Sequence, residues 1–204
     1  MSVLERVHGR FVYPRRIARL AEELARAVPP GAHVLDVGSG DGAVAIALMR
    51  IRPDVRVDGV DVLIRPETAI PTQQFDGRTL PHADDSFDVA MLVDVVHHAA
   101  EPLRLLGEAR RVARRGLVLK DHLLEGPLAE WTLRLMDRTG NARHGVALRF
   151  DYWPRERWNA VFAELGLTPS RWVERLGLYP WPASLAFDRS LHFIARLEPP
   201  DPAP

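Results

Sequence analysis

The chain has 204 residues, a length typical of one domain with a substantial hydrophobic core. Its 27 basic and 27 acidic residues cancel, so charge gives no reason to expect nucleic acid or an anionic membrane as a partner. Cysteine is absent, which excludes disulfides, a thiolate nucleophile and cysteine metal ligands. We expect no signal peptide and no membrane insertion, and therefore a cytoplasmic location.

The N-terminal part of the chain has a helical pattern. Apolar residues recur at helical spacing, Pro14 suits the first turn, and Pro29-Pro30-Gly31 ends the pattern. We therefore predict a helical segment over residues 1–29, one domain over residues 30–197, and a disordered, proline-rich tail over residues 198–204.

A glycine-rich turn follows this segment. Val34–Val37 is typical of a buried strand, Gly38, Gly40 and Gly42 come directly after it, and a helical pattern runs from about residue 42 to residue 50. A strand, a glycine turn and a helix N-terminus form the nucleotide sites of α/β folds, at the carboxyl ends of the strands. A tight turn without a ligand is the alternative, although one glycine usually suffices for such a turn.

Two acidic residues bear on which nucleotide is bound. Gly38-x-Gly40-x-x-Ala43 satisfies the loose dinucleotide fingerprint, so a nicotinamide-dependent oxidoreductase is one hypothesis. Asp36 in the strand and Asp41 in the turn instead suit a positively charged ligand such as a sulfonium. The segment Asp36–Gly42 resembles, at every position, the acid-x-Gly-x-Gly-x-Gly motif of class I S-adenosylmethionine-dependent methyltransferases.

The next predicted strand supplies an acid for the ribose. Residues 56–62 alternate between apolar and polar side chains, and Asp61 lies about twenty residues beyond the glycines, where an acid binds ribose hydroxyls in nucleotide-binding folds. Residues 63–71 contain two prolines and are too few for the usual second helix. We therefore predict a loop there, followed by a strand at residues 72–75.

A second motif strengthens the resemblance. Asp76-Gly77 and residues 80–88 resemble a passage of the same family, which implies that Asp76 accepts a hydrogen bond from the adenine amino group and that the Gly77 amide donates to the ring. The cofactor-binding residues implied in total are Asp36, Gly38, Ser39, Gly40, Asp61, Val62, Asp76, Gly77 and Asp94. The implied cofactor is S-adenosylmethionine, with S-adenosylhomocysteine as the product.

The remaining elements complete an α/β fold. The apolar run at residues 87–93 is typical of a strand buried on both faces, and residues 116–120 form another. Further predicted elements are helices at 102–113, 128–138 and 154–165, strands at 170–176 and 191–197, and a substrate-side insertion at 142–153. The resemblance implies a Rossmann-like sheet of seven strands in the order 3-2-1-4-5-7-6, with strand 7 antiparallel and the second helix shortened.

Histidines supply the candidate catalytic groups. Methyl transfer from a sulfonium is a direct displacement, so the protein mainly aligns the acceptor, and a base helps when the acceptor carries a proton of high pKa. His97 and His98 follow one strand and Asp121 follows its neighbour, so one imidazole can be oriented by that carboxylate, and we favour His98. Capping a helix or packing on the adenosine is the alternative role. His144 ranks second, and no metal site is expected because no ligand pair stands on one helix face.

The favoured hypothesis is an enzyme that transfers a methyl group from S-adenosylmethionine to a small-molecule acceptor. The main alternative is a non-catalytic S-adenosylmethionine-binding sensor or partner subunit, and the nicotinamide-dependent oxidoreductase comes third. The absence of a basic excess and of a further recognition domain favours a small molecule over nucleic acid as the acceptor. The sequence does not distinguish oxygen, nitrogen and carbon acceptors, and it does not define an oligomeric state.

Overall fold

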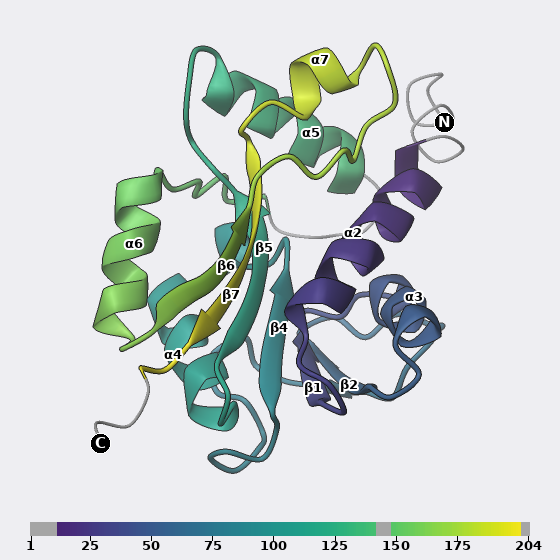
Figure 1. Ribbon diagram of the computed structural model, residues 1–204, viewed down its shortest axis with the longest axis vertical. Coiled ribbons are helices and arrows are strands. Elements are labelled where there is room, and N and C mark those ends of the chain that lie inside the picture. Colours follow the sequence, from purple (N-terminus) through teal and green to yellow (C-terminus); the bar gives the residue numbers. More distant parts are fainter. Residues whose placement is uncertain (1–11, 142–147, 201–204) are drawn as a thin grey trace.

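A computed structural model describes residues 12–141 and 148–200 and contains one seven-stranded sheet in the order β3-β2-β1-β4-β5-β7-β6 (Figure 1). The strands are β1 (His33–Val37), β2 (Arg56–Asp61), β3 (Thr72–Gln74), β4 (Val89–Val93), β5 (Leu117–His122), β6 (Thr168–Val173) and β7 (His192–Glu198). The first five pair in parallel, and β7 runs antiparallel to both of its neighbours. The predicted strand order and the single antiparallel strand are confirmed.

Helices cover both faces of this sheet. They are α2 (Tyr13–Ala27), α3 (Ala43–Ile51), the 3-10 turn η2 (Val96–His98), α4 (Pro102–Val112), α5 (Ala129–Asn141), α6 (Arg155–Glu164) and α7 (Ser184–Phe187). In Figure 1, α4 and α6 lie on one side of the sheet, α2 and α3 lie on the other, and α5 and α7 lie beyond the carboxyl ends of β4 and β5. The helix pattern of the sequence predicted all of these except η2 and the four-residue α7.

The alternation of side chains along the strands explains the two layers. Leu35 of β1 packs with α4 and α6 in one buried cluster, whereas its neighbour Val34 packs with α2 and α3 in the other. Met91 and Leu92 of β4 divide between the clusters in the same way. Successive residues of a strand point to opposite faces, so a continuous apolar run serves both layers at once.

Two local features differ from, or refine, the sequence pattern. Residues 62–71 between β2 and β3 contain no helix, as their prolines predicted. β5 continues to His122, so Asp121 and His122 lie within the strand rather than in the loop after it. The strand continues because Asp121 and His122 pair with Phe193 and His192 of the long strand β7.

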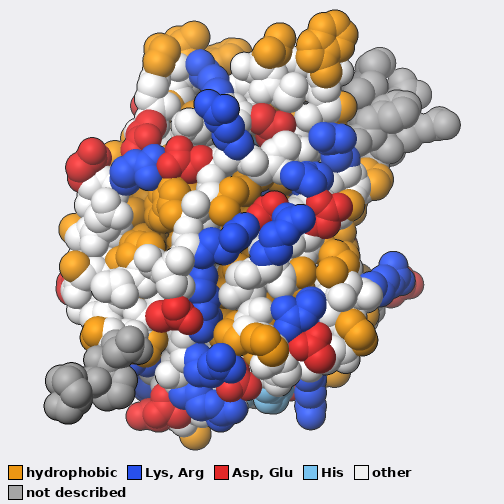
Figure 2. Space-filling model, in the orientation of Figure 1, with side chains coloured by type: hydrophobic (Ala, Val, Ile, Leu, Met, Phe, Trp, Pro, Cys, Tyr) orange, Lys and Arg blue, Asp and Glu red, His pale blue; other side chains and the backbone are white. Residues whose placement is uncertain are grey.

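Charged side chains of both signs are mixed on the face seen in Figure 2, and hydrophobic groups lie along its upper edge over α5 and α7. The exposed apolar residues of that region include Leu128, Trp131, Trp181 and Leu185. Within the described residues, every helix is too short or too polar to cross a bilayer. His144, residues 142–147 of the predicted insertion and residues 201–204 of the predicted tail lie outside the described residues.

Candidate functional site

A cavity of about 580 Å³ opens over the carboxyl ends of β1, β2 and β4. Its size falls within the range of about 300–1,000 Å³ that is usual for small-ligand sites. The turn after β1, the ends of β2 and β3, and η2 form its floor and one side, while α2 and α5 supply residues on the others. This is the edge of the sheet at which parallel α/β folds bind their ligands.

The glycine turn forms part of the cavity with bare backbone. Gly38, Gly40 and Gly42 all have positive φ, at +76°, +59° and +77°. A side chain at Gly38 would also collide, because an added Cβ would lie 2.5 Å from Cγ2 of Val95. The Gly38 amide donates to the Val60 carbonyl at 2.7 Å, which ties the turn to β2. Glycine is therefore required at Gly38 both for the backbone conformation and for space.

Asp61 and Asp36 occupy different environments although both were predicted to bind the cofactor. Asp61 lines the cavity, and its two carboxylate oxygens accept the amides of Gly40 at 2.8 Å and Leu63 at 2.9 Å. These bonds hold the carboxylate in one orientation at the cavity surface. Asp36 is only 3% exposed inside β1 and does not line the cavity. Burial and the neighbouring charge of Asp61 raise the pKa of Asp36 to about 7.

The other predicted cofactor residues surround the same cavity. Gly38, Ser39, Gly40, Val62, Asp76, Gly77 and Asp94 all line it. One oxygen of Asp76 accepts the amides of Arg78 and Thr79, each at 2.8 Å, and these bonds lower the pKa of the Asp76 carboxyl. Gly77 has a φ of +77°, so the chain turns sharply beside this acid.

Asp94 stands at the end of β4 between two cations. It forms ion pairs with Arg16 of α2 and with Lys120 of β5. Burial alone would raise the pKa of Asp94, but the charges of Arg16 and Lys120 hold it well below its usual range. Lys120 is fully buried and Arg16 lines the cavity. The pair with Arg16 joins α2 to the edge of the sheet.

The sequence analysis expected one histidine both to be oriented by Asp121 and to face the cavity. In the structure these two properties belong to different histidines. The Nδ1 of His97 donates to Oδ1 of Asp121 at 2.6 Å, but both side chains are 1% exposed and neither lines the cavity. His98 does line the cavity. Burial opposes the charge on His97, but Asp121 and Asp137 raise its pKa to about 10. Burial and the charge of His97 lower the pKa of His98 to about 4, so His98 is neutral at pH 7.

Arg16 and Asp137 are among the cavity residues that the sequence analysis did not predict. Asp137 accepts a hydrogen bond from the hydroxyl of Tyr152 at 2.6 Å. It lies four residues after the buried Leu133 and therefore on the same face of α5, just as Arg16 precedes Leu20 on α2. A charged residue on the apolar stripe of a helix is the signal that would have found both.

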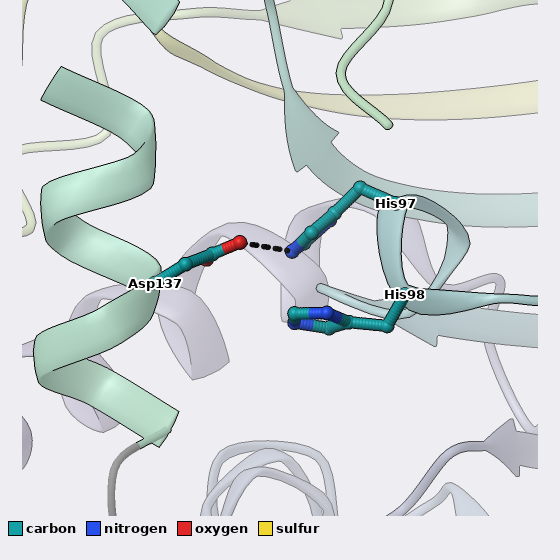
Figure 3. Close-up of side chains that lie close together, drawn as sticks. All are labelled: His97, His98 and Asp137. Carbon is teal, nitrogen blue, oxygen red and sulfur yellow. Dashed lines mark ion pairs between the residues drawn. The ribbon is translucent and has the colours of Figure 1, made fainter. Parts of the chain in front are cut away.

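One cluster of side chains beside the cavity has the chemistry of a metal site. His97, His98 and Asp137 each place one potential ligand atom within 4.8 Å of the others (Figure 3). The expectation of no metal site rested on ligand pairs within a single helix. The structure instead brings ligands together from η2 and α5, and Asp137 lies 39 positions after His98 in the sequence.

The sheet order, the glycine turn and the oriented Asp61 define a class I methyltransferase fold with a nucleotide-type cavity. The sequence matches the methyltransferase-domain family over residues 8–170, so the chain belongs to the S-adenosylmethionine-dependent methyltransferase family. A protein of Mycolicibacterium vanbaalenii named as an uncharacterized methyltransferase is 30% identical over 164 residues, which cover 72% of this chain and 62% of that protein.

Two further comparisons agree with this assignment. The 27-O-demethylrifamycin SV methyltransferase of Amycolatopsis mediterranei is 31% identical over 123 residues, covering 52% of this chain and 45% of that enzyme. The crystal structure of an S-adenosylmethionine-dependent methyltransferase from Aquifex aeolicus has the same fold, with a TM-score of 0.60 and 18% identity over 91% of this chain and 92% of that one. The chain spans about three fifths of the length of the first curated relatives it matches.

Proposed function

We propose that this protein transfers a methyl group from S-adenosylmethionine to a small-molecule acceptor by direct displacement. The observation that carries the proposal is the Asp61 carboxylate, which two backbone amides orient at the surface of a glycine-turned cavity. A carboxylate in this position matches a pair of ribose hydroxyls, since it offers acceptor oxygens and charge-assisted hydrogen bonds. The small-molecule name of the Amycolatopsis relative and the net charge of zero support an acceptor of this class.

The residues around the cavity fit the cofactor in three parts. The bare backbone of the turn at Gly38 and Gly40 allows close approach, and Asp61 receives the ribose. Val62, Asp76 and Gly77 hold the adenine, and Arg16 with Asp94 offers both signs of charge to the amino-acid end. When bound, S-adenosylmethionine supplies a methyl group that is already activated by a positively charged sulfur.

The histidines then serve the acceptor. His98 faces the cavity as a neutral imidazole, so it accepts a hydrogen bond from an acceptor hydroxyl or amine and orients that group. Its depressed pKa makes it a weak base, so most of the acceleration comes from alignment rather than from proton removal. The buried His97–Asp121 pair holds η2, and hence His98, in place.

Ligand binding tests the cofactor assignment. At about a hundred times its dissociation constant a ligand stabilises by roughly 2.7 kcal/mol, which corresponds to a melting shift of very roughly 5–10 °C for a domain of this size. We expect S-adenosylhomocysteine to produce this shift, NAD to produce none, and Asp61→Ala to remove most of it because the ribose acceptor is gone. Thermal denaturation followed by circular dichroism measures all three.

The matched control is Asp58→Ala, which removes another acid of β2 that pairs with His33 and does not line the cavity. This variant should keep the full shift with S-adenosylhomocysteine. An Asp61→Ala protein that also kept it would refute the ribose assignment, and a larger shift with NAD would favour the oxidoreductase. Labelled S-adenosylmethionine with a panel of small-molecule hydroxyl, amine and carbon acceptors then tests turnover. Binding without transfer to any of them would favour a sensor.

A further inference from the structure

We propose that His97, His98 and Asp137 bind one divalent transition-metal ion beside the cavity. Figure 3 shows His97 and His98 projecting from one turn of chain toward Asp137 on the facing helix. Their three potential ligand atoms all lie within 4.8 Å of one another. This site goes beyond the proposed methyl transfer and does not depend on it, because ion binding is a property of the protein alone.

The geometry of the pair at its centre matches metal coordination. Nε2 of His97 lies 3.4 Å from Oδ2 of Asp137. Two ligands held at about 2.0–2.2 Å from zinc at tetrahedral angles are themselves about 3.4 Å apart. The Nε2 atom of His97 is buried and has no hydrogen-bond partner among the described residues. It forms a long ion pair with Asp137, and an ion between the two atoms would replace that contact with two coordination bonds.

Neighbouring groups orient both of these ligands, as metal sites require. Asp121 accepts a hydrogen bond from Nδ1 of His97 at 2.6 Å, which fixes the ring so that Nε2 faces Asp137, and a bound ion would replace the proton that Nε2 carries at neutral pH. Asp121 is itself fixed, since it accepts the backbone amides of Val96 at 3.1 Å and His122 at 2.7 Å. On the other side, the Tyr152 hydroxyl donates to Asp137 at 2.6 Å.

The ligand set indicates which ions would bind and what they would face. Two imidazoles and one carboxylate suit Zn²⁺, Co²⁺ or Fe²⁺ rather than Mg²⁺ or Ca²⁺, which prefer oxygen ligands. Three protein ligands leave at least one coordination position open. His98 and Asp137 line the cavity, so the proposed ion would lie beside the space in which an acceptor would lie.

Metal titration of the full chain tests the site. Protein stripped with a chelator is titrated with Zn²⁺ and Co²⁺ by calorimetry, and its metal content after dialysis is measured by mass spectrometry. We expect one ion per chain and a visible absorption band with Co²⁺. Asp137→Asn and His98→Gln should each weaken binding at least about tenfold, and Asp121→Asn, which alters the orienting group, about 10- to 100-fold.

The control is His33→Gln, which removes an imidazole that lies 2.6 Å from Asp58 at the opposite end of β1. This variant should bind the ion as the original protein does. Thermal denaturation with and without S-adenosylhomocysteine establishes that each variant is folded, and it reports on the cofactor site separately. Folded protein that binds neither ion, or ligand variants that bind as tightly as the original chain, would overturn the proposal. A missing S-adenosylhomocysteine shift would instead count against the proposed function.

Discussion

The acids Asp36 and Asp61 lie on neighbouring strands, but one is buried and the other reaches the cavity. Asp61 reaches the cavity and accepts two backbone amides, whereas Asp36 lies within the sheet at 3% exposure. Two neighbouring carboxylates repel each other when both are ionised. The buried one, which has no water to solvate its charge, therefore keeps its proton to a higher pH. The raised pKa of Asp36, at about 7, is the cost of placing a second acid beneath the one that faces the ligand.

This cost predicts a pH dependence of stability. Between about pH 4 and pH 7 the folded protein keeps a proton on Asp36 that the unfolded chain releases, so the free energy of unfolding falls as pH rises through this window. A difference of about three pKa units at 1.36 kcal/mol each gives a loss of about 4 kcal/mol at most. Asp36→Asn carries no ionisable proton, so its free energy of unfolding should fall less over the same window.

Urea denaturation at pH 5 and pH 8 measures the difference. The exposed acid Asp85 supplies the control, because Asp85→Asn should leave the pH dependence of the original protein in place. Parallel pH profiles for Asp36→Asn and the original protein would contradict the raised pKa of Asp36.

How far the sequence predicts the site depends on how local each contribution is. Asp61, Asp76 and the glycine turn lie in short motifs whose spacing alone places them at the ends of strands. Arg16 and Asp137 enter the cavity only because α2 and α5 dock against its sides. Docking depends on contacts between distant segments, so periodicity predicts those helices without predicting where their polar residues point. The roles of His97 and His98 separated for the same reason, since a turn of 3-10 helix sets their directions.

At the scale of elements, strand identity was readily predicted and strand length was not. Apolar runs and alternation located the buried strands, because a buried parallel sheet demands them. The polar, largely exposed β3 was placed instead by its position before Asp76-Gly77. β5 extends to His122 although Asp121 and His122 are polar, because each has partners in the folded protein. These partners belong to β7 and η2, which are distant in sequence from the end of β5. No local pattern therefore predicts that β5 continues to His122.

The pairing of β5 with β7 leads to a prediction at Gly116. This residue precedes β5 with a φ of +94°, and an added Cβ would overlap the carbonyl oxygen of Leu197 in β7. Gly116→Ala should therefore cost about 3 kcal/mol or more, from backbone strain together with displacement of a strand. That corresponds to a fall in melting temperature of roughly 6–12 °C, measured by calorimetry.

Gly166 supplies the matched control at the end of α6. Its φ is +63°, but an added Cβ would have no heavy atom within 4 Å. Gly166→Ala should cost about 1 kcal/mol from backbone strain alone, or roughly 2–4 °C in melting temperature. Equal losses at the two positions would mean that the close approach of β7 to Gly116 does not matter.

At the scale of the whole molecule, helix α2 is joined to β6 and to the segment that follows β6, far along the chain. Arg15 and Arg19 of α2 donate to the carbonyls of Gly177 and Leu176 at 3.1 and 3.2 Å. Arg171 of β6 pairs with Glu23 of the same helix at 3.0 Å. The N-terminal helix is thus packed into the core and also supplies Arg16 and Leu20 to the cavity. A ligand in the cavity would contact segments drawn from both halves of the sequence.

Hydrogen exchange tests this arrangement directly. Amides that exchange only by global unfolding slow equally everywhere when a ligand binds, so the informative amides are those that exchange by local opening. With saturating S-adenosylhomocysteine we expect such amides to slow in residues 38–44, 61–63 and 76–80 and in α2, because these segments supply cavity residues. α6 and β6 supply no cavity residues, so their amides should keep their exchange rates. Slowing confined to the glycine turn, with α2 unchanged, would mean that the N-terminal helix supports the sheet without enclosing the ligand.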